Sequence, residues 1–159
     1  RSAVPVPQRA GPCPWKKKVP PKDTPWTKVI VCGTRSFEDY DFVAFKLDQI
    51  TVRFEAIQLV VGGMGKRVEK RGEWSWIGVD YLAVKWAEFN WWPRNIFWPD
   101  WDRHGKAAGP IRNKEMAEFA APDGYCIAFW DGESKGTQSM IEYAEDYLPK
   151  SHVRIVELP

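Results

Sequence analysis

From Trp26 onward the chain alternates short apolar runs with longer amphipathic stretches, and this alternation limits the possible fold more than any other feature. Apolar runs of five to seven residues bounded by glycine or polar turns are typical of buried strands. We predict strands at residues 28–32, 57–61, 95–98, 124–130 and 152–157. The 3.6-residue period predicts helices from about residue 39, over 77–90, over 110–121 and over 137–148. Strands joined by helices require right-handed crossovers, so we expect an α/β fold with a parallel sheet of about five strands and helices on both faces.

The first part of the chain differs in composition from the rest. The first 28 residues hold seven of the thirteen prolines, seven of the 23 basic residues and one acidic residue, a charge of +6. The remainder carries 16 basic and 20 acidic residues, a charge of −4. Proline removes an amide donor and favours extended backbone. We therefore predict an extended, basic, Pro-rich arm over residues 1–26 before one domain over 27–159. The alternatives for the arm are a disordered linker and a segment that lies on its own body, a sister subunit or another partner.

Several protein classes do not fit the sequence. No apolar run reaches the roughly 18 residues of a membrane-spanning helix, so no membrane is expected. No apolar signal core follows Arg1, and Cys13, Cys32 and Cys126 form neither a CxxC motif nor an even disulfide framework. We therefore expect a cytoplasmic location.

Polar and glycine-containing segments follow four of the predicted strands. They are residues 33–36, 62–63, 100–113 and 131–137. The carboxyl ends of parallel strands share one edge, where such sheets bind ligands. Glycines allow close backbone approach, helix N-terminal amides attract anions, and Arg35, Arg112 and Lys135 add positive charge. This combination predicts a phosphate-binding site, although each glycine turn taken singly is explained by a tight connection. Ser134 to Thr137 resembles the end of a P-loop without the upstream glycine, so ATPase chemistry is not expected.

Five segments together resemble one known group of proteins. They are residues 29–35, 60–63, 78–80, 100–113 and 128–137. In this combination the chain resembles the YspA/YpsA-related branch of the SLOG superfamily, small Rossmann-like domains of bacteria and their phages, over about residues 27–158. The resemblance implies binding of a nucleotide or a nucleotide-derived ligand, such as an ADP-ribose or phosphoribosyl compound. It also implies a bacterial or phage-infected cell, with virion association as an option.

The four loops and the resemblance together give a set of ligand-binding candidates. They are Gly33, Thr34, Arg35, Gly62, Gly63, Asp80, Asp102, Arg112, Asn113, Gly132, Ser134, Lys135, Gly136 and Thr137. We expect Arg112 and Lys135 to pair with phosphate oxygens, while amides near Gly136 and Thr137 complete the anion site. No catalytic residue, cofactor or metal is assigned.

The chain departs from the resembled pattern at two places. Residues 64–77 intervene between the Gly-Gly turn and the Gly-x-Asp motif, and this insertion at the binding edge is a lid, an interface or a tolerated surface loop. The second departure is Met140, which stands where related phosphoribohydrolases carry a glutamate. Glu142 lies about 200° further round the helix and cannot replace that carboxylate. Whether the chain is an enzyme is therefore uncertain; as an enzyme it would be a nucleotide N-glycosidase.

Other groupings of residues leave alternatives open. Asp100, Asp102 and His104 stand at every second position, a spacing that metal ligands can have, but the sequence has no second His or Cys cluster to complete a metal site. His104 is either a general acid or base or a loop histidine bonded to backbone. The pairs Trp91-Trp92 and Trp98-Trp101 either stack on nucleobases or pack in the core and between subunits. The net acidic body makes nucleic acid a less expected partner.

Three functional hypotheses follow from these observations. The first is a ligand-binding SLOG-type domain, the second a nucleotide N-glycoside hydrolase, and the third a structural or assembly protein that uses the arm and the insertion. We also expect a homo-oligomer or larger assembly, formed through the arm and through surface tryptophans. These tryptophans are Trp74, Trp76, Trp91 and Trp92.

Overall fold

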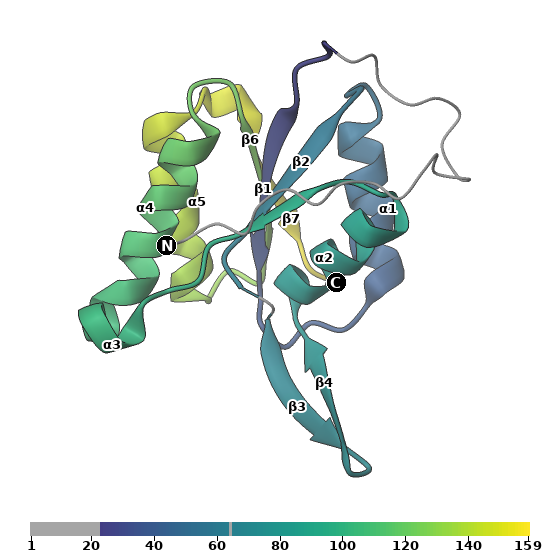
Figure 1. The fold of residues 1–159 in the computed structure, drawn as a ribbon, viewed down its shortest axis with the longest axis vertical. Coiled ribbons are helices and arrows are strands. Elements are labelled where there is room, and N and C mark those ends of the chain that lie inside the picture. The colour runs from purple at the N-terminus through teal and green to yellow at the C-terminus, as the bar shows by residue number, and fades with distance from the viewer. Residues whose placement is uncertain (1–22, 64) are drawn as a thin grey trace.

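The central element of the fold is a five-stranded parallel sheet. A computed structural model describes residues 23–63 and 65–159 of the chain. The strands are β1 (Thr27–Gly33), β2 (Ile57–Val61), β5 (Arg94–Ile96), β6 (Tyr125–Trp130) and β7 (Val153–Glu157). Their order is β5-β2-β1-β6-β7, and every neighbouring pair is parallel (Figure 1). The predicted α/β fold with a parallel sheet is confirmed.

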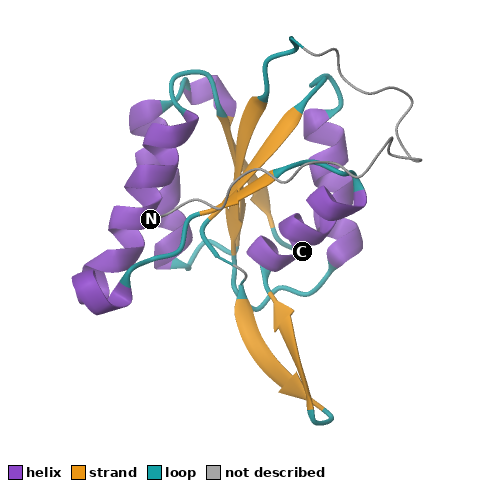
Figure 2. Ribbon diagram, viewed as in Figure 1, coloured by secondary structure: helices purple, strands orange, loops and turns teal. Residues whose placement is uncertain are grey.

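Two pairs of helices cover the two faces of this sheet (Figure 2). They are α1 (Tyr40–Thr51) with α2 (Val79–Phe89), and α4 (Ala108–Ala120) with α5 (Lys135–Tyr147). Successive side chains of β1 point to opposite faces. Val29 and Val31 belong to the core under α1 and α2, whereas Ile30 and Cys32 belong to the core under α4 and α5. The sheet is therefore apolar on both faces, which explains its continuous apolar strand sequences.

The segment predicted as a long polar loop before Pro110 is largely helical. It forms α3 (Trp101–His104), a 3₁₀ turn (Gly105–Ala107) and the start of α4. The carboxylate of Asp100 begins α3 by accepting a hydrogen bond from the amide of Arg103 at 3.1 Å. Pro110 is the third residue of α4 instead of its first. Proline is tolerated there because amides in the first helical turn have no intrahelical partner.

The insertion at residues 64–77 contains a β-hairpin. Its strands β3 (Lys66–Lys70) and β4 (Glu73–Ile77) pair antiparallel and extend away from the carboxyl edge of the sheet (Figure 1). Arg71 and Gly72 connect them with φ values of 54° and 80°, the left-handed conformation that two-residue hairpin turns require. The helix predicted from residue 77 begins at Val79, because Ile77 ends β4 and Gly78 has a φ of 108°.

The tryptophans expected at the surface do not all lie there. Trp74 is 61% exposed, and Trp76 and Trp91 are half-buried. Trp92 is buried, so the expectation that it lies at the surface was wrong. Its ring and that of Trp26 are perpendicular, with centroids 6.2 Å apart, and Trp92 belongs to the core beside α2. Of the predicted arm, residues 1–22 lie outside the described part of the chain. None of the helices in the described residues has the length and apolar character needed to cross a membrane.

Candidate functional site

A cavity of about 540 Å³ lies at the carboxyl edge of the sheet, where the sequence predicts a ligand site. We call it the carboxyl-edge cavity. Its walls come from the ends of β1 and β2, the first turn of α2, the segment from β5 to α4, and the first turns of α4 and α5. Its volume lies within the range of about 300 to 1,000 Å³ that is typical of small-molecule sites.

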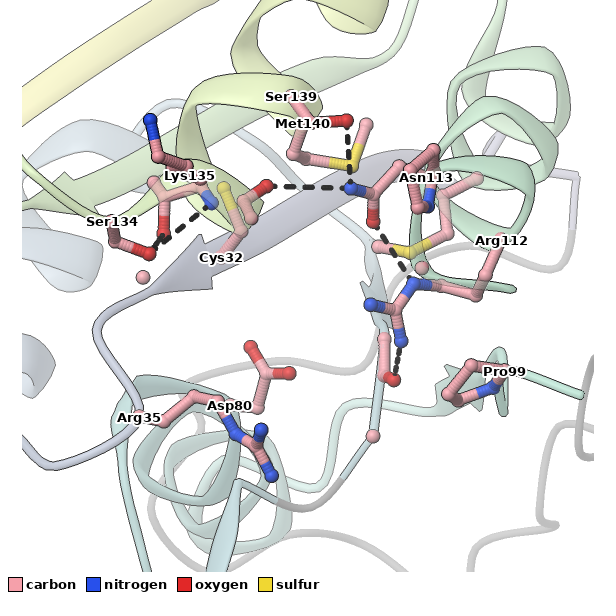
Figure 3. A pocket seen from close by; sticks show the side chains of 18 of the residues that line it. Cys32, Arg35, Asp80, Pro99, Arg112, Asn113, Ser134, Lys135, Ser139 and Met140 are labelled. Atoms are coloured by element: carbon pink, nitrogen blue, oxygen red, sulfur yellow. Dashed lines mark hydrogen bonds between the residues drawn. The ribbon is translucent and has the colours of Figure 1, made fainter. Parts of the chain in front are cut away.

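Eleven of the fourteen residues proposed from the sequence line this cavity. They are Gly33, Arg35, Gly62, Gly63, Asp80, Arg112, Asn113, Ser134, Lys135, Gly136 and Thr137. Figure 3 shows several of these side chains converging from the two faces of the sheet.

The other three proposed residues lie outside the cavity lining. The backbone of Thr34 joins strand to helix: its amide donates to the Phe129 carbonyl at 3.2 Å, and its carbonyl accepts from the Val79 amide at 3.1 Å. Asp102 is exposed on α3, and Gly132 is exposed in the turn after β6. The positive φ of Gly132, 84°, explains the glycine by turn geometry.

The turn before α5 is organised by its own side chains. Asp131 Oδ1 accepts hydrogen bonds from the amides of Glu133 and Ser134 at 2.9 and 2.8 Å, and these bonds lower the pKa of the Asp131 carboxyl. Ser134 caps α5 by accepting from the Thr137 amide at 3.4 Å. At Gly136 no atom lies within 4 Å of where a Cβ would stand. The start of α5 is therefore open to the cavity, with the exposed ammonium group of Lys135 beside it.

Arg112 is held by hydrogen bonds within the protein. Its Nη1 donates to the carbonyl of Gly62 and, at 3.4 Å, to that of Phe97, while its Nε donates to Asn113 Oδ1 at 2.9 Å. Gly62 is required there, because a Cβ would lie 2.6 Å from Nη1. Among the described residues Nη2 has no hydrogen-bond acceptor, and burial lowers the pKa of the guanidinium.

Asn113 extends this contact network to the opposite wall of the cavity. Its Nδ2 donates to the Gly136 carbonyl and to Ser139 Oγ, each at 3.3 Å (Figure 3). The network therefore ties α4 to the first turns of α5 and, through Arg112, to the ends of β2 and β5.

Asp80 is the acidic group of the cavity. It lies in the first turn of α2, beside Arg35 in Figure 3. Burial raises the pKa of its carboxyl to about 7, although the positive charges of Arg112 and Arg35 act in the opposite direction. The cavity thus contains a carboxyl group that changes charge near neutral pH.

Aromatic side chains form a wall that our set of candidate residues did not include. Trp98 and Trp101 line the cavity and remain 36% and 55% exposed. Gly63 and Gly109 lie beside these rings, since a Cβ at either glycine would stand 3.9 Å from the nearer indole, an ordinary van der Waals contact. From the sequence, the pair Trp98-Trp101 was a candidate for stacking on nucleobases or for packing. The structure adds that both rings line the cavity, because α3 begins at Trp101.

The floor of the cavity is apolar and contains no substitute for the missing glutamate. Met140 is buried and lines the cavity, whereas Glu142 is exposed and lies outside the lining.

Cys32 also lines the floor of the cavity. A hydrogen bond with Cys126 and burial raise the pKa of its thiol well above the usual value, so it is not an activated nucleophile. His104 lies outside the lining, and the described residues contain no group of three or more His, Cys, Asp or Glu side chains suited to a metal ion.

The strand order and the cavity at the carboxyl edge define the chain as a Rossmann-like α/β protein. It is similar to the Gene 61 protein of Mycobacterium phage D29, with 29% identity over 119 residues that cover 74% of this chain and 88% of the phage protein. No family profile matches the sequence. No solved structure matches it either.

Proposed function

We propose that the chain binds a nucleotide or a nucleotide-derived ligand, such as an ADP-ribose or phosphoribosyl compound, in the manner of a SLOG-type domain. One observation carries this proposal. A single cavity combines an anion-attracting end, at the start of α5 with Lys135, and an aromatic wall, at Trp98 and Trp101. A phosphate requires the first feature and a nucleobase the second.

The residues of the cavity have separate roles in this proposal. Lys135 and the amide of Gly136 bind the phosphate, because Lys135 is exposed at the cavity and the space beside Gly136 is open. Arg112 positions the loops through its bonds to Gly62 and Asn113 and offers Nη2 to the ligand. Trp101, the more exposed of the two indoles, stacks on the base.

Titration calorimetry with AMP, ADP-ribose and ribose 5-phosphate tests this assignment. Loss of one charge-assisted hydrogen bond costs about 1.5 to 3 kcal/mol, so Lys135→Ala is expected to weaken binding of all three compounds by about tenfold or more. Lys114→Ala is the matched control, since Lys114 is exposed on α4 outside the cavity lining. Trp101→Ala is expected to weaken AMP and spare ribose 5-phosphate. Equal affinities of wild type and Lys135→Ala would contradict the phosphate assignment.

A second candidate, nucleotide N-glycoside hydrolysis, is favoured by Asp80. A carboxyl with a pKa of about 7 can donate a proton to a leaving base at neutral pH. Chromatographic detection of free base from AMP, present with wild type and absent with Asp80→Asn, would establish hydrolysis. If wild type released no free base, hydrolysis would be excluded and ligand binding would be the only function proposed for the cavity.

The similarity to a phage protein is compatible with a bacterial or phage-infected cell, where we propose a cytoplasmic location. Assembly of a larger structure is the alternative function. In that alternative the basic arm and exposed Trp74 form subunit contacts. Light scattering at micromolar concentration tests this: an oligomer supports it, and a monomer contradicts it.

A further inference from the structure

The hairpin of β3 and β4 has features that neither the core nor the carboxyl-edge cavity explains. A two-stranded ribbon is at best marginally stable alone. This one projects from the body (Figure 1), with Lys70 Nζ and Glu38 Oε1 paired at 2.7 Å near its turn. Its Trp74 is 61% exposed, so that ring gains little from burial.

The strand register places both hairpin tryptophans on one face. Arg67 pairs with Trp76, and Glu69 pairs with Trp74. Side chains of residues paired across a ladder share a face, so Arg67, Glu69, Trp74 and Trp76 lie together. The Arg67 guanidinium carbon lies 4.5 Å from the centre of the Trp74 ring, which holds that indole in place while leaving it accessible.

The hairpin also concentrates positive charge on a body that is net acidic. Residues 66–77 hold four basic and two acidic side chains, and in the described structure only Lys70 of the four forms an ion pair. Lys66, Arg67 and Arg71 are exposed cations without a carboxylate partner there. An accessible indole face against Arg67, with exposed Arg71 in the adjoining turn, matches the chemistry of a single nucleic-acid strand, which offers a base and a phosphate at each nucleotide.

Both ends of the hairpin lie at the rim of the carboxyl-edge cavity. Gly65, directly before β3, lines the cavity. Gly78, directly after β4, packs so closely on Arg35 that a Cβ would lie 2.5 Å from the Arg35 carbonyl oxygen. The base of the hairpin therefore adjoins the cavity.

We propose that the Arg67–Trp74–Trp76 face of the hairpin binds single-stranded nucleic acid, with bases stacked on the indoles and phosphates paired with Arg67 and Arg71. The net charge of the whole body does not favour such a partner, but the local charge of the hairpin does. A sequence-independent interaction is expected, since stacking and phosphate contacts carry no base code.

Fluorescence anisotropy of a labelled oligothymidylate of about 16 nucleotides tests the proposal on the full chain. Trp74→Ala is expected to reduce affinity at least fivefold, and Trp74→Phe to restore most of it, because phenylalanine retains a stacking face. Phe45→Ala is the matched control: Phe45 is 63% exposed on α1, and its loss is expected to change nothing. Arg67→Ala is expected to weaken binding and to make the salt dependence shallower, whereas Arg154→Ala, an exposed cation on β7, leaves both unchanged.

Two results would overturn the proposal. One is equal oligonucleotide affinity for wild type, Trp74→Ala and Phe45→Ala, which would assign any binding to other basic segments. The other is the absence of oligonucleotide binding together with a dimer, seen by light scattering, that Trp74→Ala dissociates; the hairpin face would then be a contact between two copies of this chain. Calorimetry of Trp74→Ala with AMP separates this proposal from the cavity assignment, because AMP affinity is expected to be unchanged.

Discussion

Replacing Asp80 by asparagine is expected to change the pH dependence of stability in a defined direction. The folded protein holds the pKa of this carboxyl at about 7 instead of 3.8, chiefly because of burial. Between these values the unfolded chain has ionised Asp80 while the folded protein keeps the proton. Unfolding then releases a proton, so rising pH favours unfolding. Asp80 therefore does not change the free energy of unfolding at pH 3. It lowers that free energy progressively from about pH 4 to pH 7, and the full destabilisation is reached above pH 7.

The magnitude follows from the same two values. At about 1.4 kcal/mol per pH unit, a pKa change from 3.8 to about 7 corresponds to about 4 kcal/mol. The side chain keeps partial contact with solvent in the cavity, which lowers the penalty, so we expect about 2 to 4 kcal/mol. Asparagine has nearly the same shape and does not ionise. The free energy of unfolding of Asp80→Asn should thus exceed that of wild type by this amount at pH 8, with the advantage vanishing near pH 4.

Urea denaturation of both proteins from pH 4 to pH 8 measures this difference directly. Asp102→Asn is the control, because Asp102 is exposed on α3 outside the cavity, and it should follow wild type throughout. If Asp80→Asn ran parallel to wild type over the whole range, the carboxyl would not be held in its protonated form and our account of the cavity charges would be refuted.

Three further predictions concern the surroundings of the site. Gly62→Ala is expected to displace the Arg112 guanidinium, lowering the free energy of unfolding by about 1 to 3 kcal/mol in urea denaturation; wild-type stability would contradict the packing of Arg112 on Gly62. Met140→Ala should cost about 2 to 5 kcal/mol and Met140→Leu less than about 1.5, since Met140 is 1% exposed; equal melting temperatures would refute its burial. Removal of residues 1–22 should preserve a cooperative melting transition by circular dichroism, because both core clusters lie between Val29 and Leu158; loss of that transition would make the arm part of the core.

The main sheet could be predicted because each of its strands is a distinct run in the sequence. Val29 to Val31 and Leu59 to Val61 are continuously apolar, as strands buried on both faces must be. The hairpin could not be predicted in the same way. The sequence Lys66 to Lys70 is almost entirely polar, and its pairing depends on the turn at Arg71 and Gly72.

The composition of the site was predictable, but the state of its residues was not. Glycines and cations after the strand ends point to one edge, which is why most of the proposed residues meet in the cavity. The bonds from Arg112 to Gly62 and Phe97 join positions 50 and 15 residues apart, which no local pattern encodes. The pKa of Asp80 likewise depends on burial by elements distant in the sequence.

Our central claim is that one cavity receives a phosphate at the start of α5 and a base against the tryptophan wall. Titration of isotope-labelled protein with AMP, followed by amide and indole resonances in NMR spectra, tests both halves at once. We predict saturable shifts at the amides of Lys135 and Gly136 and at the indoles of Trp98 and Trp101, with ribose 5-phosphate shifting the amides and not the indoles. Saturable shifts confined to other parts of the chain, or none at millimolar AMP, would contradict the claim.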